Sequence, residues 1–210
     1  GWQPLSELVV GERIAAPREL PVFGTEALDE HEVSLLGLLL GDGTLTVGDG
    51  RNGSIRFTNR SDDIVAEANR CAELAGTRLV GAGRAGEYRF SGGRGCAPGS
   101  SGVLELVRRH GLAGSNAHTK HVPDAVYRLP REQLAVFLNR LFATDGWASV
   151  AASGAAQVGF ASVSEDLARP VQHLLLRFGV VASLRRKRVH YLGSERSCWQ
   201  VVITHRESLR

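Results

Sequence analysis

Two nonapeptides decide the architecture of this 210-residue chain: LLGLLLGDG at residues 35–43 and LNRLFATDG at residues 138–146. Each is a mostly apolar run that ends in Asp-Gly, which is typical of a buried helix that stops at its glycine. The final carboxylates, Asp42 and Asp145, face the negative end of the helix dipole, which is electrostatically unfavourable. The pattern therefore predicts two buried helices, and it indicates that the carboxylates at their ends are functional residues.

The spacing between the two aspartates recurs elsewhere in the chain. At the same offset of 103 positions, several residues meet identical residues further along. We therefore predict two related halves, in a register without gaps from residue 42 to residue 91. The matched pairs are Phe57 with Phe160, Ser61 with Ser164, Asp63 with Asp166, Gly76 with Gly179, and Tyr88 with Tyr191.

Each half is predicted to fold as helix, hairpin, helix, hairpin. Apolar–polar alternation marks the strands, and Ser61 and Ser164 are the expected N-caps of the second helices. The fold class is α+β, with two pseudo-symmetric αββαββ halves and antiparallel sheets. We expect helices at 29–41, 61–76, 130–144 and 164–179, and strands at 44–48, 54–60, 77–81, 87–91, 147–151, 157–162, 181–188 and 198–204.

The expected divisions of the chain follow from this order of elements. Residues 1–24 form a separate, strand-like lead-in, residues 25–128 the first half, and residues 129–210 the second half. The glycine-rich stretch 92–102 is expected to be a loop within the first half.

The strands are predicted to carry a basic open face. Ile55 and Phe57 point to the core, which places Arg56 on the other face, and Ser183, Arg185 and Lys187 likewise share one face. The net charge is +3, and 23 of the 25 basic residues are arginine. Arginine suits phosphate and guanine contacts. An ordinary solvated sheet face, with the arginine excess set by the base composition of the coding DNA, is the alternative.

The two acidic helix ends are predicted to meet. Gly37 and Gly41 lie on one face of the first helix, and Ala143 and Thr144 end the second, so the helices can pack closely about a pseudo-twofold axis. Two carboxylates and the unpaired carbonyls of the helix ends suit one to three divalent cations and phosphoryl chemistry. The alternative is that each Asp-Gly is only a turn after a helix.

Composition excludes several classes of protein. No apolar run is long enough to span a membrane, and nothing resembles an export leader, so we expect a cytoplasmic protein. The three cysteines are odd in number and far apart, which argues against a disulfide framework or a structural zinc site. His118 and His121 lack a third ligand nearby and are expected to be surface or phosphate-facing residues.

The two nonapeptides resemble the paired motifs of the LAGLIDADG homing endonucleases. Lys120-His121-Val122-Pro123 and the stretch 172–179 are similar to two further sequence blocks of the intein-encoded branch, and 1–24 resembles the segment that joins a protein-splicing domain to its inserted nuclease. The likeness covers nearly the whole chain and is greatest to inteins of replicative helicases. The junction residues of a splicing protein are absent, so we expect no splicing activity.

This resemblance implies a monomeric site-specific endonuclease that cuts both strands of a long, asymmetric duplex DNA at an intein insertion site. Asp42 and Asp145 would hold Mg²⁺ with the carbonyls of Gly41 and Thr144. Lys120 matches the family's basic residue beside the scissile phosphate, and Lys187 is the candidate in the second half, with a simple phosphate contact as the alternative.

The resemblance also implies that the sheets form a saddle on the major groove of DNA. Two alternatives stay open: a catalytically degenerate module that binds DNA or RNA, and an insert that only supports splicing. The expected DNA-binding residues are Arg51, Asn52, Arg56, Thr58, Arg84, Arg89, Gln157, Arg185, Lys187 and His190.

Overall fold

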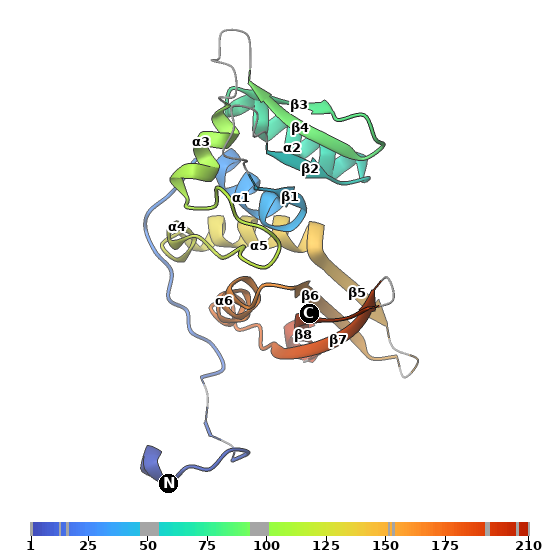
Figure 1. Cartoon of the computed structure of the whole chain (residues 1–210). Coiled ribbons are helices and arrows are strands. Elements are labelled where there is room, and N and C mark those ends of the chain that lie inside the picture. Colours follow the sequence, from blue (N-terminus) through green and yellow to red (C-terminus); the bar gives the residue numbers. More distant parts are fainter. Residues whose placement is uncertain are drawn as a thin grey trace.

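The computed structural model describes residues 2–12, 14–15, 17–46, 55–92, 101–150, 152, 154–191, 194–204 and 206–209. Two similar halves lie on either side of a central pair of helices (Figure 1). The first half contains α1 (Glu30–Asp42), β1 (Gly43–Thr44), β2 (Arg56–Thr58), α2 (Asp62–Leu74), β3 (Thr77–Gly81) and β4 (Glu87–Gly92). The second contains α5 (Arg131–Asp145), β5 (Gly146–Val150), β6 (Ala156–Ser162), α6 (Glu165–Leu176), β7 (Ser183–Tyr191) and β8 (Ser194–Ile203).

The predicted α+β class and the order of elements are confirmed. Each half has a four-stranded antiparallel sheet, in the order β1-β2-β4-β3 in one and β5-β6-β8-β7 in the other. The first two strands of the halves pair in the same register, since Gly43 lies opposite Phe57 and Gly146 lies opposite Phe160. Both phenylalanines are fully buried. The offset read from the sequence thus reflects equivalent core positions.

The offset breaks down in the second hairpins, where the predicted match of Tyr88 with Tyr191 is wrong. Tyr88 lies in β4 opposite Phe57, but the residue opposite Phe160 is Val201 in β8. Tyr191 lies instead at the end of β7. The physical reason is length: β7 and β8 have 9 and 10 residues, whereas β3 and β4 have 5 and 6.

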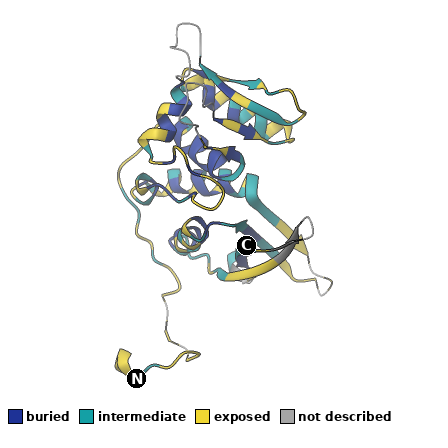
Figure 2. Ribbon diagram, viewed as in Figure 1, coloured by how far each residue is buried: buried dark blue, intermediate teal, exposed yellow. Residues whose placement is uncertain are grey.

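The central helices pack closely because glycines on α1 leave room for α5. Figure 2 shows α1 as almost entirely buried, and nine of its thirteen residues are buried. A Cβ atom added at Gly37 would lie 2.7 Å from the carbonyl oxygen of Phe137, and one added at Gly41 would lie 1.9 Å from Oγ1 of Thr144. The predicted close approach of the two helices is therefore confirmed.

Two helices that follow β4 in the first half were not predicted. Helix α3 (Gly102–Arg109) begins at Ser101, whose Oγ accepts a hydrogen bond from the Leu104 amide, and buries Val103, Leu104, Leu106 and Val107. The short α4 (Asp124–Tyr127) follows a proline N-cap. Most of the loop expected at 92–102 lies outside the described residues.

The lead-in does not form the strand-like segment that the sequence predicted. In its described part it contains a short 3-10 helix, η1 (Leu5–Glu7), and no strand. The amide of Leu20 donates to the carbonyl of Leu176, and Phe23 packs against Phe178 with ring centroids 5.2 Å apart. A second 3-10 helix, η2 (Arg206–Leu209), follows β8. None of the helices in the described part of the chain has the length and apolar character needed to cross a bilayer.

Candidate DNA-facing acidic site

The two acidic helix ends lie together at the centre of the molecule. Each helix ends at the glycine after its acid, where the amide of Gly43 donates to Leu39 and that of Gly146 donates to Phe142. The preceding residues touch, since Gly41 lies against Thr144. Asp42 and Asp145 are both half-buried, and the charge of Asp42 acts on Asp145.

Lys120 reaches the same point from the segment between α3 and α4. Its Nζ donates to the carbonyl oxygens of Leu40 at 2.8 Å and Gly41 at 2.7 Å, and the residue is only 7% exposed. Lys120 therefore satisfies two carbonyl groups at the C-terminal end of α1, and its positive charge lies near both acids. Sequence reasoning identified this residue only through the family resemblance, because its distance from Asp42 along the chain gives no hint of contact.

The electrostatics of this trio are dominated by burial. Burial, the largest cause, and the neighbouring charge of Asp42 together raise the pKa of Asp145 to about 6, against the lowering effect of Lys120. Burial also raises the pKa of Asp42, against the opposing effects of Asn59 and Lys120. Burial lowers the pKa of Lys120 to about 8, although both acids act to raise it. All three groups shift towards their neutral forms, so their mutual attraction does not compensate for lost hydration.

Asn59 distinguishes the first acid from the second. Its Nδ2 donates to Oδ2 of Asp42 at 2.5 Å, while its Oδ1 accepts from the amide of Ser61 at 2.7 Å. At the equivalent position of the second half, the Oγ of Ser162 accepts from the amide of Ser164 at 3.1 Å. Both turns thus have the same local bond, but Asn59 is long enough to hold a carboxylate as well. The sequence analysis missed this residue.

Ser164 is the N-cap residue of α6, as the sequence predicted, but its side chain has a different partner. The side chain makes no capping bond. Its Oγ instead donates to the carbonyl oxygen of Lys120 at 2.6 Å, and the residue is 1% exposed. Ser61 likewise makes no side-chain cap bond and is exposed. Ser164 of the second half therefore fixes the backbone of Lys120, whose charge interacts with both acids.

The donor set fits a hard divalent cation shared with other oxygen ligands. No cluster of three or more His, Cys, Asp or Glu side chains suited to a metal occurs among the described residues. Two half-buried carboxylates next to helix-end carbonyls supply part of an octahedral set, and Mg²⁺ commonly keeps water or phosphate oxygens as well. A cation would also offset the loss of hydration and the repulsion from Asp42, which together raise the pKa of Asp145. His118 and His121 take no part in such a cluster.

The open face of the first sheet carries arginines at adjacent positions. Arg56 lies directly opposite Arg89 across β2 and β4, and both are exposed. Like charges in cross-strand pairs are unfavourable by themselves. Thr58 shares this face, and Arg78, an exposed residue that the prediction omitted, lies on it in β3. This arrangement suits a polyanionic ligand.

The open face of the second sheet continues the basic surface. Arg185 and Lys187 are exposed and lie on the face of β7 opposite to that of Leu184, which pairs with the buried Val201. Arg185 lies opposite Gln200, another residue that the prediction omitted. Gln157 lies on the same face in β6. The predicted common face of Ser183, Arg185 and Lys187 is confirmed by their register.

Lys187 is not brought to the acids. The strand order separates β7 from β5, which directly follows Asp145, by two other strands. The charges that act on Asp145 are those of Asp42 and Lys120. The position of Lys187 on the exposed sheet favours the phosphate contact, and its catalytic role is unsupported by this placement.

The remaining predicted DNA-binding residues lie in a turn or outside the described part of the structure. Arg84 lies in the turn between β3 and β4, 3.8 Å from Glu87 and 84% exposed. Arg51 and Asn52 lie outside the described residues, as does the side chain of His190, whose backbone belongs to β7.

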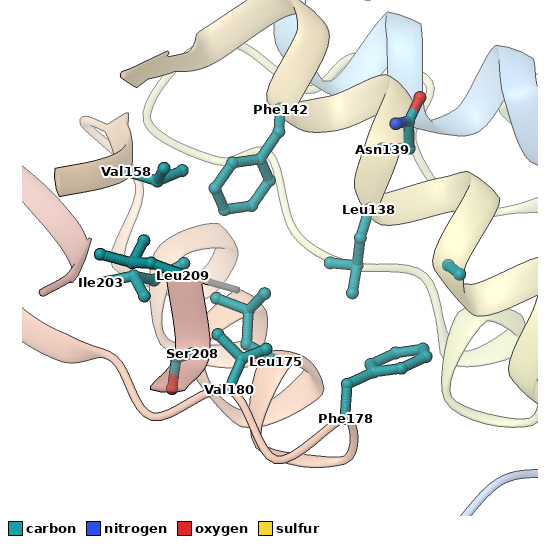
Figure 3. Close-up of a pocket in the computed structure, with 11 residues that line it drawn as sticks. Leu138, Asn139, Phe142, Val158, Leu175, Phe178, Val180, Ile203, Ser208 and Leu209 are labelled. Atoms are coloured by element: carbon teal, nitrogen blue, oxygen red, sulfur yellow. The ribbon is translucent and has the colours of Figure 1, made fainter. Parts of the chain in front are cut away.

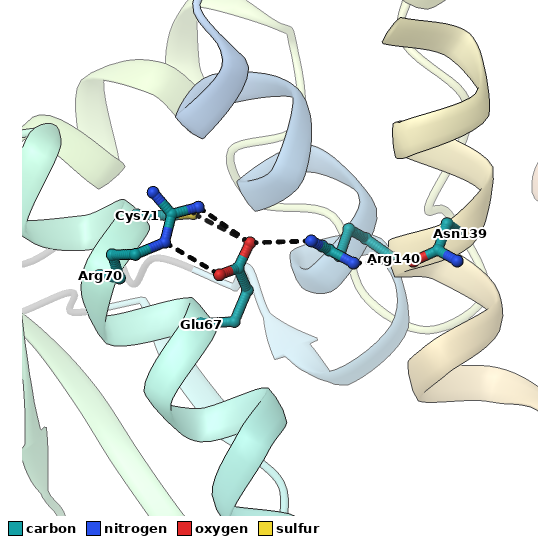
Figure 4. Close-up of polar contacts among 5 residues, drawn as sticks. All are labelled: Glu67, Arg70, Cys71, Asn139 and Arg140. Atoms are coloured by element: carbon teal, nitrogen blue, oxygen red, sulfur yellow. Dashed lines mark hydrogen bonds and ion pairs between the residues drawn. The ribbon is translucent and has the colours of Figure 1, made fainter. Parts of the chain in front are cut away.

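Arg140 replaces the glycine of the first motif without opening the helix seam. Its Cβ lies against Gly37, where a Cβ added to the glycine would come within 2.8 Å. Its guanidinium extends to α2 and binds Glu67 at 3.1 Å, and Glu67 also pairs with Arg70 (Figure 4). The pairing with Arg70, and then the charge of Arg140, lowers the pKa of Glu67. The long side chain therefore links the two halves.

An apolar pocket of about 440 Å³ lies away from the acids, between α5, α6 and the C-terminal segment (Figure 3). Phe142, Leu175, Phe178 and Leu209 line it. It contains few polar groups and no acid or base suited to catalysis, so it is not the functional site.

The fold is that of the LAGLIDADG homing endonucleases. Mesophilic variants of the homing endonuclease I-DmoI superpose with a TM-score of 0.58 at 13% identity, over 86% of this chain and 85% of that chain. Full-length WhiA from Thermotoga maritima gives 0.56 at 12% identity, over 92% of this chain and 57% of that chain. Other I-DmoI structures are complexes with DNA and Mn or Ca.

Sequence comparison identifies the second half as a LAGLIDADG-like domain, since that family model matches residues 132–210. Protein RecA of Mycobacterium tuberculosis is 33% identical over 192 residues, which cover 88% of this chain and 23% of RecA. Replicative DNA helicase DnaB of Rhodothermus marinus is 33% identical over 197 residues, covering 88% and 20% respectively. The chain therefore spans less than a quarter of these relatives.

Proposed function

We propose that this chain is a site-specific endonuclease that cuts both strands of a long, asymmetric duplex DNA in a reaction that requires a divalent metal. The observation that carries the proposal is the meeting of Asp42, Asp145 and Lys120 between two sheets with basic open faces. The fold likeness to I-DmoI, whose structures include DNA and divalent metals, supports it.

The residues of the site divide the work between them. Asp42 and Asp145 would hold the cation, with the carbonyl of Thr144 as a further oxygen donor. The carbonyl of Gly41, the other expected ligand, already accepts a hydrogen bond from Nζ of Lys120 at 2.7 Å and would have to exchange that bond for the cation. When bound, the cation supplies Lewis-acid stabilisation of the charge that develops at the phosphate. Lys120 supplies a fixed positive charge beside the acids, and Asn59 holds the carboxylate of Asp42 in one orientation.

The biological setting is part of the same proposal. The matches to segments of RecA and DnaB, each covering under a quarter of those proteins, support an origin as the nuclease insert of an intein. The target is then the joined sequence that flanks the insert in its host gene. Two unequal halves in one chain favour a monomer that reads two unequal half-sites.

Plasmid cleavage tests the proposal, with joined host flanks as the target. We expect linear product in Mg²⁺ and a gel shift without cleavage in Ca²⁺. Asp42→Asn and Asp145→Asn should each abolish double-strand cleavage and leave DNA affinity within a fewfold of wild type. Asp63→Asn, an exposed acid in the first turn of α2, is the control and should cut normally. Normal cutting by either of the first two variants would remove that acid from the mechanism.

A DNA-binding module without cleavage is the second candidate. The fold matches WhiA about as well as I-DmoI, and among the described residues only one lysine lies at the acids. A specific gel shift with no cutting in Mg²⁺ or Ca²⁺ would favour this function. Binding no tighter than to unrelated DNA would favour an insert that only supports splicing.

A further inference from the structure

Trp147 is a bulky residue on the open face of the second sheet, close in sequence to Asp145. It follows Asp145 by two positions, at the start of β5. Gly146 pairs with the buried Phe160, so Trp147 points to the opposite face, where it lies across from Gly159. This is the face that also carries Arg185 and Lys187.

The indole is seated on a glycine. A Cβ atom added at Gly159 would lie 2.4 Å from Cε2 and Cζ2 of Trp147 and 2.8 Å from its Nε1. The ring therefore occupies the space that a side chain would fill at that position. Val202, directly across from Gly159 on the next strand, is only 8% exposed. Together these residues form an apolar patch within an otherwise polar and basic surface.

The indole both covers the glycine and remains partly exposed. An aromatic ring over a strand glycine can compensate for the missing side chain, but Trp147 is only half-buried and keeps part of its surface exposed. The first half has no such pair, because its equivalent residues are the exposed Thr44 and Arg56. The ring thus adds an apolar surface to one half only, beside its acid.

We propose that Trp147 reads the base pairs next to the cut in the second half-site by contacting the C5-methyl group of thymine. In the major groove this methyl is the apolar feature that distinguishes T·A from other pairs, and the surrounding arginines and lysine would hold the phosphates on either side. The inference rests on the proposed function and deepens it by assigning a specificity residue.

Selection from a randomised duplex library tests the assignment. Wild-type protein and variants would retain duplexes in Ca²⁺, and the bound DNA would be sequenced. We expect wild type to enrich T·A pairs nearest the cut in one half-site, and Trp147→Ala to lose that enrichment while keeping the others. Gly159→Ala should do the same, because its added methyl displaces the ring. Trp199→Phe, a partly buried tryptophan on the opposite face of the sheet near Arg169, is the matched control.

A second measurement changes the DNA and leaves the wild-type protein intact, so its result does not depend on how a variant folds. Replacing that thymine by deoxyuridine removes only the methyl, and should weaken wild-type binding about fourfold, as expected for one buried apolar carbon. The same replacement should leave Trp147→Ala unaffected. If wild type selects a sequence but neither the variants nor deoxyuridine change the preference near the cut, the assignment to Trp147 is wrong. If wild type selects no sequence, the proposed function itself fails.

Discussion

The contacts of single side chains make the two halves chemically unequal. Asn59 binds the first acid, and the residue at its equivalent position, Ser162, does not extend beyond its own turn. Ser164 instead holds the backbone of Lys120. The turn before the second helix thus holds the Asp42 carboxylate in the first half, through Asn59, and the Lys120 backbone in the second half, through Ser164. We expect the two strands of the target to be cut at different rates for this reason.

Replacing Ser164 by alanine should impair cleavage more than binding. The buried carbonyl of Lys120 would lose its hydrogen-bond donor, which costs about 1–3 kcal/mol, and the lysine would lose its fixed position. Single-turnover cleavage should slow at least tenfold, and thermal unfolding should show a modest loss of stability. Ser61→Ala changes the exposed equivalent in the first half and should alter neither; equal effects of the two variants would contradict the positioning role.

The raised pKa of Asp145 predicts that the metal-free protein becomes less stable as pH rises. The folded state keeps the proton up to about pH 6, whereas the unfolded chain releases it near 3.8. Stability therefore falls as pH rises through this window. At pH 7.5 in EDTA, Asp145→Asn should unfold roughly 3–6 °C higher than wild type, a shift that allows for partial solvent screening.

Calorimetry at pH 4 and pH 7.5 provides the control for this prediction. The advantage of Asp145→Asn should be largest at the higher pH and should shrink at the lower one. Added Mg²⁺ should raise the melting temperature of wild type and leave that of the variant unchanged. An advantage that stays constant with pH would mean that the ionised carboxylate is not the source of the instability.

The packing of α1 on α5 determines whether the site exists, because it brings the two acids together. The seam tolerates a large residue only on one side. Arg140 fits because the opposing residue is Gly37, and its guanidinium leaves the seam to reach Glu67. A side chain at position 41 would not fit, since Thr144 fills the space beside Gly41.

Gly41→Ala should therefore separate the helix ends. The added methyl would lie 1.9 Å from Oγ1 of Thr144, and overpacking of this kind costs roughly 1–3 kcal/mol. Denaturant unfolding measures the loss, and cleavage should fall with it. Gly81→Ala is the control, because a Cβ there meets nothing within 4 Å. Comparable stability of the two variants would show that the seam is looser than the structure indicates.

Much of this arrangement was predictable from the sequence. The two apolar runs with Asp-Gly ends, the shared offset and the alternation at Ile55 and Phe57 identified the halves, the helix seam and the open faces. The second hairpins broke the offset because β7 and β8 are longer than β3 and β4, and a difference in strand length leaves no periodic signal. Helix α3 was missed although Ser101 and its apolar spacing were visible. Contacts such as Ser164 with Lys120 depend on tertiary folding and have no local pattern.

The molecule as a whole has two sheets whose open faces carry basic side chains. Arg56, Arg78 and Arg89 lie on one open face, and Arg185 and Lys187 on the other. Each phosphate contact contributes about 0.9 to the slope of log affinity against log salt. The summed charge therefore matters more for binding than the modest net charge of +3 suggests.

Affinity for a duplex should fall steeply with salt, and Arg56→Ala should reduce the slope by about one unit. Titrations by fluorescence anisotropy between low and moderate salt would measure this. Arg108→Ala removes an equal charge from α3, where the arginine pairs with Glu105, and should leave the slope unchanged. Identical slopes for all three proteins would mean that the open face of the first sheet does not contact phosphates.

The longer second hairpin has a consequence for the extent of DNA that the protein covers. Strand β8 exceeds β4 by four residues, and four residues of extended chain span about 14 Å. A duplex rises about 3.4 Å for each base pair, so on the proposed DNA target the second half would reach about four base pairs further from the centre. That target would then have one arm longer than the other, with the scissile bonds off its midpoint.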